Sequence, residues 1–241
     1  MKTVIITGGT SGIGLASAKI FIENNYNCVI VGRSQSKAET ALAELNNCAV
    51  YIQVDVSKPS DCVNVVNETV KHFGRVDALV NSAGIYTEGA ITDVDELEFE
   101  RIFNTNVKGT FFMCKAAITE LKKNCGSIVN IASDAAVKGN YYCALYSASK
   151  GAVTAFTKSL ALELAHIPIR VNCVAPADVL TPLTLNQLKL SGETVESLAS
   201  VYPMRRIAQP HEVAEAVYFL SSDKSSFTTG TVLLVDGGLS A

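Results

Sequence analysis

The sequence predicts an α/β fold in which helices cover both faces of one doubly wound parallel sheet. Short apolar segments rich in β-branched residues recur along the 241 residues, and longer segments with helical periodicity separate them. The apolar segments are continuous rather than alternating, which is typical of strands buried on both faces. No repeat and no Pro/Ser-rich linker divides the chain. We therefore expect a single domain, residues 1–241, with right-handed crossovers between about seven strands.

Seven segments have the length and composition of buried strands. In chain order they are Val4–Thr7, Cys28–Val31, Val50–Val54, Ala78–Asn81, Ser127–Ala132, Ile169–Val174 and Val232–Val235. Six segments between them carry apolar residues at helical spacing. They are Gly12–Asn25, Lys37–Leu45, Cys62–Phe73, Leu97–Lys122, Tyr146–Leu164 and His211–Ser222. Residues 176–210 break the alternation, and a segment of that length without a strand is typical of a substrate-binding loop.

Composition narrows the possible partners and the compartment. The 20 Lys and Arg against 23 Asp and Glu give a net charge of −3, which suits neither nucleic acid nor an anionic membrane. Seven scattered cysteines without a C-x-x-C motif favour a reduced, cytoplasmic protein. The first apolar run is too short for a signal peptide or a membrane span. Three dispersed histidines provide no metal-ligand pattern, so we expect no metal.

The first predicted strand runs into a glycine-rich turn that opens a helix. Residues 7–14 read T-G-G-T-S-G-I-G, a T-G-x-x-x-G-x-G pattern. Free N–H groups at a helix N-terminus bind phosphate, and glycines let the backbone approach it closely. Leu15 and Ala16 stand where a Walker NTPase needs Lys and Ser/Thr, which disfavours that class. The turn instead predicts a dinucleotide site in a Rossmann-type fold.

The end of the second strand predicts which dinucleotide is bound. An acid about 20 residues beyond the glycines would bind the ribose 2′-hydroxyl of NAD, but this strand ends in Val31-Gly32-Arg33-Ser34. The planar fork of Arg33 suits the 2′-phosphate of NADP. A charge-assisted hydrogen bond of ~1.5–3 kcal/mol corresponds to roughly a ten- to hundredfold preference. We therefore expect NADP(H), with NAD(H) as the alternative if Arg33 is only a solvated surface residue.

A tyrosine and a lysine at the start of a long helix are candidates for proton transfer. Tyr146 and Lys150 are four residues apart and so share one helical face. An ammonium one turn away favours the phenolate and lowers the tyrosine pKa from ~10. Ser133 follows the fifth strand and Asn81–Gly84 end the fourth, so both reach the carboxyl edge where α/β sheets bind ligands. Asn106 lies inside the preceding long helix.

Together these motifs resemble the short-chain dehydrogenase/reductase family. In family order the chain has the glycine loop, Asp55, N-S-A-G at 81–84, Asn106, Ser133, Y-x-x-x-K at 146–150 and V-D-G-G at 235–238. The resemblance covers nearly the whole chain. It implies an oxidoreductase that transfers a hydride between a nicotinamide cofactor and a carbonyl or secondary alcohol.

The resemblance also implies a role for each matching polar residue. Tyr146 would be the general acid or base. Lys150 would bind the nicotinamide ribose and lower the pKa of Tyr146. Ser133 would hydrogen-bond the carbonyl oxygen, and Asn106 would hold a water that relays protons to Lys150.

The residues expected to contact the cofactor come from the glycine loop, the ends of several strands and the segment after the sixth strand. The family usually has Pro-Gly after that strand, whereas this chain has Pro176-Ala177. Because alanine restricts positive φ, we expect a different loop path there. The full set is Gly8, Thr10, Ser11, Gly12, Ile13, Gly14, Arg33, Asp55, Val56, Asn81, Ala83, Gly84, Tyr146, Lys150, Pro176, Val179 and Thr181.

The resemblance leaves the substrate open. Members similar to 3-oxoacyl-carrier-protein reductase need a basic patch for an acidic carrier. The alternatives are an NAD-dependent sugar, polyol or hydroxysteroid dehydrogenase, and a non-catalytic NADP-sensing protein on the same fold. Family members commonly form closed symmetric assemblies, which implies a homotetramer or a homodimer. The candidates for the basic patch are Lys122, Lys123, Arg205 and Arg206.

Overall fold

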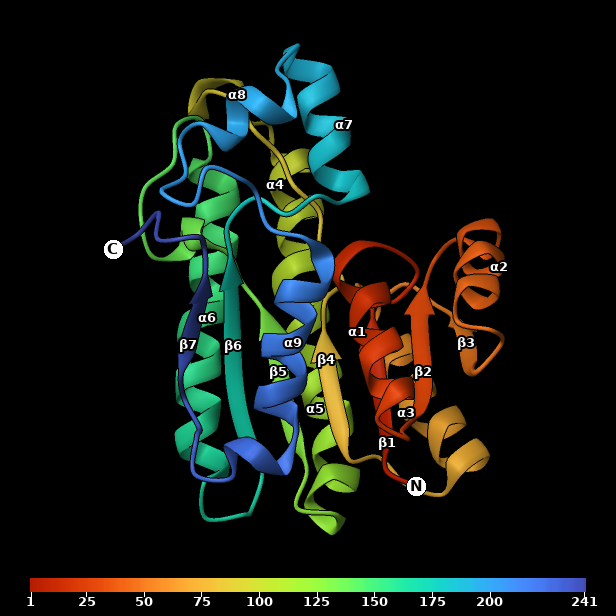
Figure 1. Ribbon diagram of the computed structural model, residues 1–241. Coiled ribbons are helices and arrows are strands. Elements are labelled where there is room, and N and C mark those ends of the chain that lie inside the picture. The colour runs from red at the N-terminus through yellow and green to blue at the C-terminus, as the bar shows by residue number, and fades with distance from the viewer.

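The computed structural model describes residues 1–241 and confirms the predicted class of fold. Seven parallel strands form one sheet in the order β3-β2-β1-β4-β5-β6-β7 (Figure 1). The chain winds from β1 toward one edge and then from β4 toward the other. The strands are β1 (Thr3–Thr7), β2 (Asn27–Gly32), β3 (Ala49–Gln53), β4 (Ala78–Asn81), β5 (Ser127–Ile131), β6 (Arg170–Pro176) and β7 (Val232–Val235).

The reversal of strand order lies between β1 and β4. The two strands pair in parallel from Val4 opposite Ala78 to Thr7 opposite Asn81. Their carboxyl ends therefore open side by side, and helices leave them on opposite faces. Ligands of doubly wound sheets bind at this kind of switch point.

Nine α-helices connect the strands or follow them. They are α1 (Gly12–Glu23), α2 (Gln35–Glu44), α3 (Pro59–Phe73), α4 (Glu96–Phe103), α5 (Thr110–Lys123), α6 (Ala144–Leu164), α7 (Pro182–Ser191), α8 (Val195–Ala199) and α9 (Pro210–Ser221). None of them combines the length and the apolar composition that a membrane-spanning helix needs.

The helix predicted as one element over Leu97–Lys122 is interrupted. A π-helical segment, η2 (Asn104–Gly109), joins α4 to α5. The apolar periodicity continues across it, so the sequence pattern shows no break. π-Bulges of this kind occur often at functional sites, and this one contains Asn106.

Two apolar layers cover the sheet. Alternate residues of β1 point to opposite faces: Ile5 joins the layer formed with α3, α5 and α6, and Val4 joins the layer formed with α1 and α9. Figure 1 shows α1 and α9 on one face and α5 and α6 on the other. Because both faces are buried, the strands carry the continuous apolar runs seen in the sequence.

Residues 176–210 contain two helices rather than a plain loop. Thr181 caps α7 by accepting the Thr184 N–H, Pro182 opens the helix and Gly192 ends it with a φ of 76°. Val179 and Ala208 pair as an isolated bridge at the base of the segment. The segment therefore lies beyond the carboxyl ends of the strands, outside the alternation of strands and helices (Figure 1).

Candidate active site

The glycine loop is held against the end of β4. Gly8 has a φ of 67°, and a Cβ on it would lie 2.8 Å from the Ala83 nitrogen. The Ala83 N–H donates to Thr7 Oγ1 at 3.1 Å. A Cβ on Gly14 would overlap the carbonyl oxygen of Gly8. No other residue fits these two glycine positions without moving backbone, which ties the loop to Ala83.

The first turn of α1 presents free N–H groups. Ser11 occupies the N-cap position, but its side chain accepts none of them, and the turn contains no acidic residue. Thr181 closes one side of the turn, because its methyl carbon lies 3.1 Å from where a Gly12 Cβ would be. An uncapped helix start without negative charge suits a phosphate group.

Arg33 lies at the carboxyl end of β2 with an exposed side chain. Its carbonyl oxygen accepts from Gln53, and no carboxylate pairs with its guanidinium within hydrogen-bond distance. Burial opposes ionisation of the neighbouring Asp55, but hydrogen bonds from Ser57 and the charges of Arg33 and Lys58 bring the pKa of Asp55 below its usual value. The fork of Arg33 is thus free to bind a second anion.

Tyr146, Ser133 and Lys150 come together at the carboxyl edge of β5 and β6. The Ser133 side chain lies close enough to the Tyr146 hydroxyl to lower its pKa. Ser133 Oγ also donates to Asp134 Oδ1 at 2.9 Å and accepts the Ala135 N–H at 3.2 Å. Lys150 Nζ donates to the Ile131 carbonyl oxygen at 2.8 Å and lies 5.8 Å from the centroid of the Tyr146 ring.

The expectation that Lys150 lowers the pKa of Tyr146 is wrong for this arrangement. Burial raises the pKa of Tyr146 well above its ordinary value, and the nearby Ser133 side chain lowers it only in part. The ammonium lies over the ring and is directed at Ile131 rather than at the phenol oxygen. Burial also lowers the pKa of Lys150 to about 8. Desolvation is the largest cause of the shift at both groups.

Asn106 is buried within the π-helical segment and faces the same site. Its Oδ1 accepts the Ile85 N–H at 2.9 Å, and its Nδ2 donates to the Ile85 carbonyl oxygen at 2.9 Å and to Ser149 Oγ at 3.1 Å. A Cβ on Gly84 would lie 3.4 Å from Lys150 Nζ and 3.5 Å from Asn106 Oδ1. Gly84 therefore leaves open a space that both polar groups border.

Of the remaining predicted residues, Asn81 is directed into the core, and the others lie at the carboxyl edge or just beyond it. Asn81 points away from the edge: its Nδ2 donates to Asn130 Oδ1 at 2.9 Å and its Oδ1 is buried without a partner. Ala177 is not in the left-handed region, so alanine brings no strain and the expected change of loop path has no basis at this residue. The others lie at the carboxyl edge or in the segments that leave it: Thr10, Ile13, Val56, Pro176 and Val179.

Three groups that contact the predicted site residues were not predicted from the sequence. The Ile131 carbonyl holds Lys150, Ser149 holds Asn106, and the Tyr86 ring packs edge-on against Tyr146. Ser149 lies inside the Y-S-A-S-K motif, so its spacing from Tyr146 was a usable signal. A backbone carbonyl and a ring contact between distant segments leave no sequence pattern.

The predicted basic docking patch is wrong. Lys122 and Lys123 end α5 at the amino edge of the sheet, whereas Arg205 and Arg206 lie between α8 and α9 near the carboxyl edge. Lys123 pairs with Glu120 and Arg206 with Glu212, each at 2.6 Å. The four charges are separated by the length of the strands, and two of them are neutralised. The sequence could not place them because the two pairs lie on unrelated elements.

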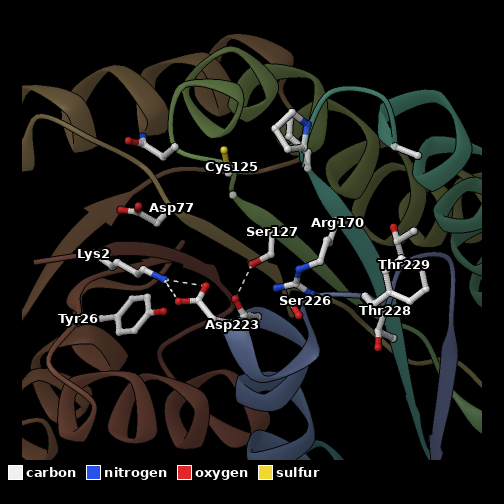
Figure 2. A pocket seen from close by; sticks show the side chains of 17 residues that line it. Lys2, Tyr26, Asp77, Cys125, Ser127, Arg170, Asp223, Ser226, Thr228 and Thr229 are labelled. Carbon is white, nitrogen blue, oxygen red and sulfur yellow. Dashed lines mark hydrogen bonds and ion pairs between the residues drawn. The ribbon is translucent and has the colours of Figure 1, made fainter.

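A cavity of about 590 Å³ lies at the opposite, amino edge of the sheet (Figure 2). Its charged groups are satisfied internally. Lys2 pairs with Asp223 at 2.8 Å, and Arg170 donates to the Leu220 and Ser222 carbonyl oxygens. None of the predicted site residues lines this cavity, so we place the candidate active site at the carboxyl edge.

The doubly wound sheet with a glycine-rich phosphate loop at its switch point defines a dinucleotide-binding α/β protein. A family model described as Enoyl-(Acyl carrier protein) reductase matches residues 8–240. The chain is 36% identical to L-fucose dehydrogenase of Bos taurus, covering 98% of this chain and 88% of the relative. It is 38% identical to human (Homo sapiens) 3-oxoacyl-[acyl-carrier-protein] reductase, covering 99% and 98%.

A solved structure, ElxO with NADP bound, superposes with a TM-score of 0.92 at 35% identity, covering 99% of this chain and 98% of that one. These similarities extend over almost the entire sequence. The chain therefore belongs to the short-chain dehydrogenase/reductase family, a family of oxidoreductases.

Proposed function

We propose that this protein is an NADP(H)-dependent oxidoreductase that interconverts a carbonyl group and a secondary alcohol. The observation that carries the proposal is the meeting of Tyr146, Ser133 and Lys150 at the carboxyl edge, beside the glycine loop. A tyrosine hydroxyl, a serine hydroxyl and a cation then lie close to one another. Reduction of a carbonyl requires the protein to donate a proton and to stabilise the negative charge that develops on the oxygen.

The chain's own residues fit a phosphorylated dinucleotide. The uncapped first turn of α1 suits the pyrophosphate, and the glycine positions leave no room for a Cβ. The unpaired guanidinium of Arg33 suits a ribose 2′-phosphate. When bound, a nicotinamide supplies or accepts the hydride.

The protein's part in the reaction is proton transfer and positioning. Tyr146 carries its proton at neutral pH because burial raises its pKa, so it is ready to donate to a carbonyl oxygen. Ser133 lies beside Tyr146 and would donate to the same oxygen when its proton turns from Asp134 Oδ1. Lys150, held by Ile131, and Asn106, held by Ile85, border the space beside Gly84. This space suits a water or a ribose hydroxyl that returns the proton to Tyr146.

A small hydroxylated or cyclic carbonyl compound fits better than a carrier-bound acyl chain. An acidic carrier needs a contiguous basic surface, and the four candidate charges do not form one. The similarity to L-fucose dehydrogenase is compatible with a sugar or polyol substrate. The similarity to a 3-oxoacyl reductase keeps acyl thioesters in the panel of test substrates.

We also propose that the protein acts as a homo-oligomer, a tetramer or a dimer. The outer side of α5 and α6 exposes Phe111, which packs against Phe156 at 5.1 Å between ring centroids. Contiguous exposed apolar patches mark association surfaces, and Phe111 with Phe156 would form part of such a patch. The seven cysteines are all free, which supports a reduced, cytoplasmic location.

The experiment that tests the proposal is a titration with NADPH and with NADH, followed by nicotinamide fluorescence. We expect NADPH to bind at least about tenfold more tightly. A reductive assay with cyclohexanone, an aldohexose and an acetoacetyl thioester then identifies the substrate class. Equal or tighter NADH binding would contradict the role of Arg33, and binding of neither would contradict the oxidoreductase proposal.

A further inference from the structure

Tyr86 lies where three segments around Tyr146 meet. It is in the loop that follows β4, and its ring packs edge-on against the Tyr146 ring, with 4.8 Å between centroids and 67° between planes. Aromatic rings favour this edge-to-face arrangement. Tyr86 thus contacts one side of the ring that we assign to proton transfer.

The hydroxyl group of Tyr86 has a complete set of partners. It donates to Glu88 Oε2 at 2.8 Å, accepts from Gln187 Nε2 at 3.3 Å and lies 3.1 Å from Cys143 Sγ. One proton and two acceptor positions are all that a tyrosine hydroxyl offers, so the thiol of Cys143 fills the remaining acceptor position. Burial, followed by the hydrogen bonds with Cys143 and Glu88, holds the pKa of Tyr86 well above its ordinary value. The hydroxyl therefore keeps its proton at neutral pH.

These partners belong to different segments. Glu88 shares the loop of Tyr86, Cys143 immediately precedes α6, and Gln187 lies on α7. The first two segments are also joined through the backbone, because the Gly89 N–H donates to the Tyr142 carbonyl at 2.8 Å. No backbone hydrogen bond joins α7 to this loop. Gln187 alone makes the hydrogen-bonded connection, since Nε2 also lies 3.3 Å from Glu88 Oε2.

The helix α7 is otherwise loosely attached on this side. It exposes Leu183, Leu185 and Leu190, and only Leu188 among its leucines is buried. Elements with few buried apolar contacts open at low free energy. Besides the buried Thr184 and Leu188, the hydrogen bonds of Gln187 hold α7 beside Tyr86.

We propose that Tyr86 is a positioning residue whose ring orients Tyr146 and whose hydroxyl, through Gln187, seats α7 beside the site. The catalytic consequence rests on the proposed function, whereas the seating of α7 does not. In such an enzyme one side chain, Tyr86, both holds α7 in the closed position and orients the proton donor, Tyr146. Loss of the hydroxyl weakens closure, and loss of the ring also displaces Tyr146.

The test of seating is amide hydrogen exchange of α7 in the full chain without substrate. Tyr86→Phe keeps the ring and removes the hydroxyl, and Gln187→Leu removes the amide at similar helix propensity. We expect α7 amides to exchange about three- to tenfold faster in each variant. The double variant is expected to be no faster than Gln187→Leu alone, because both changes remove one shared interaction. Tyr141→Phe, at a residue that is 93% exposed, is the matched control and leaves exchange unchanged.

Unchanged exchange in Tyr86→Phe, or additive acceleration in the double variant, overturns the seating role. The catalytic role is tested with whichever carbonyl compound the reductive assay identifies. We expect Tyr86→Phe to raise KM about tenfold with kcat within about threefold, with unchanged NADPH binding and unfolding midpoint. Unchanged KM overturns that role. If the unmodified protein reduces no carbonyl, the proposed function fails, while the exchange experiment still decides the seating of α7.

Discussion

We expect proton transfer to depend on a single oxygen atom, that of Tyr146. Replacing Tyr146 with Phe keeps the ring contact with Tyr86 but removes the hydroxyl group that would donate the proton. We expect turnover to fall about 100- to 10,000-fold, the usual contribution of a positioned general acid. NADPH affinity, measured by fluorescence titration, stays near that of the unmodified protein. A variant that keeps full turnover would favour a non-catalytic, NADP-sensing protein.

Cofactor choice is expected to depend on one charged side chain. Arg33→Ala removes the unpaired guanidinium at the end of β2 and so removes a charge-assisted hydrogen bond to a 2′-phosphate. We expect NADPH affinity to fall about ten- to hundredfold and NADH affinity to stay the same. Lys122→Ala, which removes an exposed charge at the far end of α5, is the control. A parallel loss for both cofactors would show that Arg33 supports the loop rather than the phosphate.

The pH dependence should have opposite signs in the two directions. Reduction needs a protonated Tyr146 and the ammonium form of Lys150, so kcat/KM should be flat below pH 8 and fall above it, where Lys150 with a pKa of about 8 loses its charge. Oxidation needs a deprotonated Tyr146, whose pKa burial raises, so its rate should climb with pH. Initial rates between about pH 6 and pH 10 measure both profiles.

A loss of stability caused by deprotonation of Lys150 cannot explain the expected fall in the rate of reduction above pH 8. The folded protein releases this proton near pH 8, whereas an ordinary lysine holds it to about 10.5. The unfolded chain therefore binds more protons over that interval, and this group makes folding more stable as pH rises. Thermal unfolding midpoints at the same pH values separate the two effects: a midpoint that fell in step with the rate would contradict the proton-transfer account.

Among the elements, the strands were predictable and the helix around Asn106 was not. Ala78–Asn81 and Val232–Val235 match the expected strands residue for residue, because burial on both faces leaves continuous apolar runs. The π-helical segment adds one residue per turn without changing which residues are apolar. It contains Asn106, which contacts Ile85 and Ser149, and no local pattern encodes such contacts between segments.

Replacing Gly8, in the loop between β1 and α1, tests how closely this loop must approach the end of β4. Gly8→Ala adds a Cβ 2.8 Å from the Ala83 nitrogen at a φ of 67°. We expect the free energy of unfolding to fall by about 1–3 kcal/mol, with weaker NADPH binding, because the loop must move away from β4. Gly89→Ala is the control, since no atom lies within 4 Å of its Cβ position. Urea denaturation of both variants measures the difference, and equal stability would mean that the loop adapts freely.

For the whole molecule, the sequence predicted that the candidate site residues share one edge of the sheet but not the exact contacts among them. Strand order and handedness place Ser133, Tyr146 and Gly84 at one rim, since parallel strands share a carboxyl edge. The direction of individual side chains was not predictable. Asn81 turns into the core toward Asn130, and Lys150 faces a backbone carbonyl. Burial then reversed the expected shift of the Tyr146 pKa, an outcome that needs three-dimensional packing.

For the whole molecule, the exposed aromatic side chain on the outer face of α5 predicts that copies of the chain associate. Phe111 on α5 is 45% exposed and contacts the rings of Phe112 and Phe156. A carboxylate buried at an interface without a partner is strongly unfavourable, so Phe111→Glu should reduce the mass measured by light scattering to that of a smaller assembly or a monomer. Leu190→Glu on α7, at a residue that is 81% exposed, is the control and should leave the mass unchanged. NADPH binding should survive in both variants, because neither side chain lies at the glycine loop. An unmodified protein that is already monomeric at micromolar concentration would contradict the proposed oligomer, and an unchanged mass for Phe111→Glu would place the interface elsewhere on the surface.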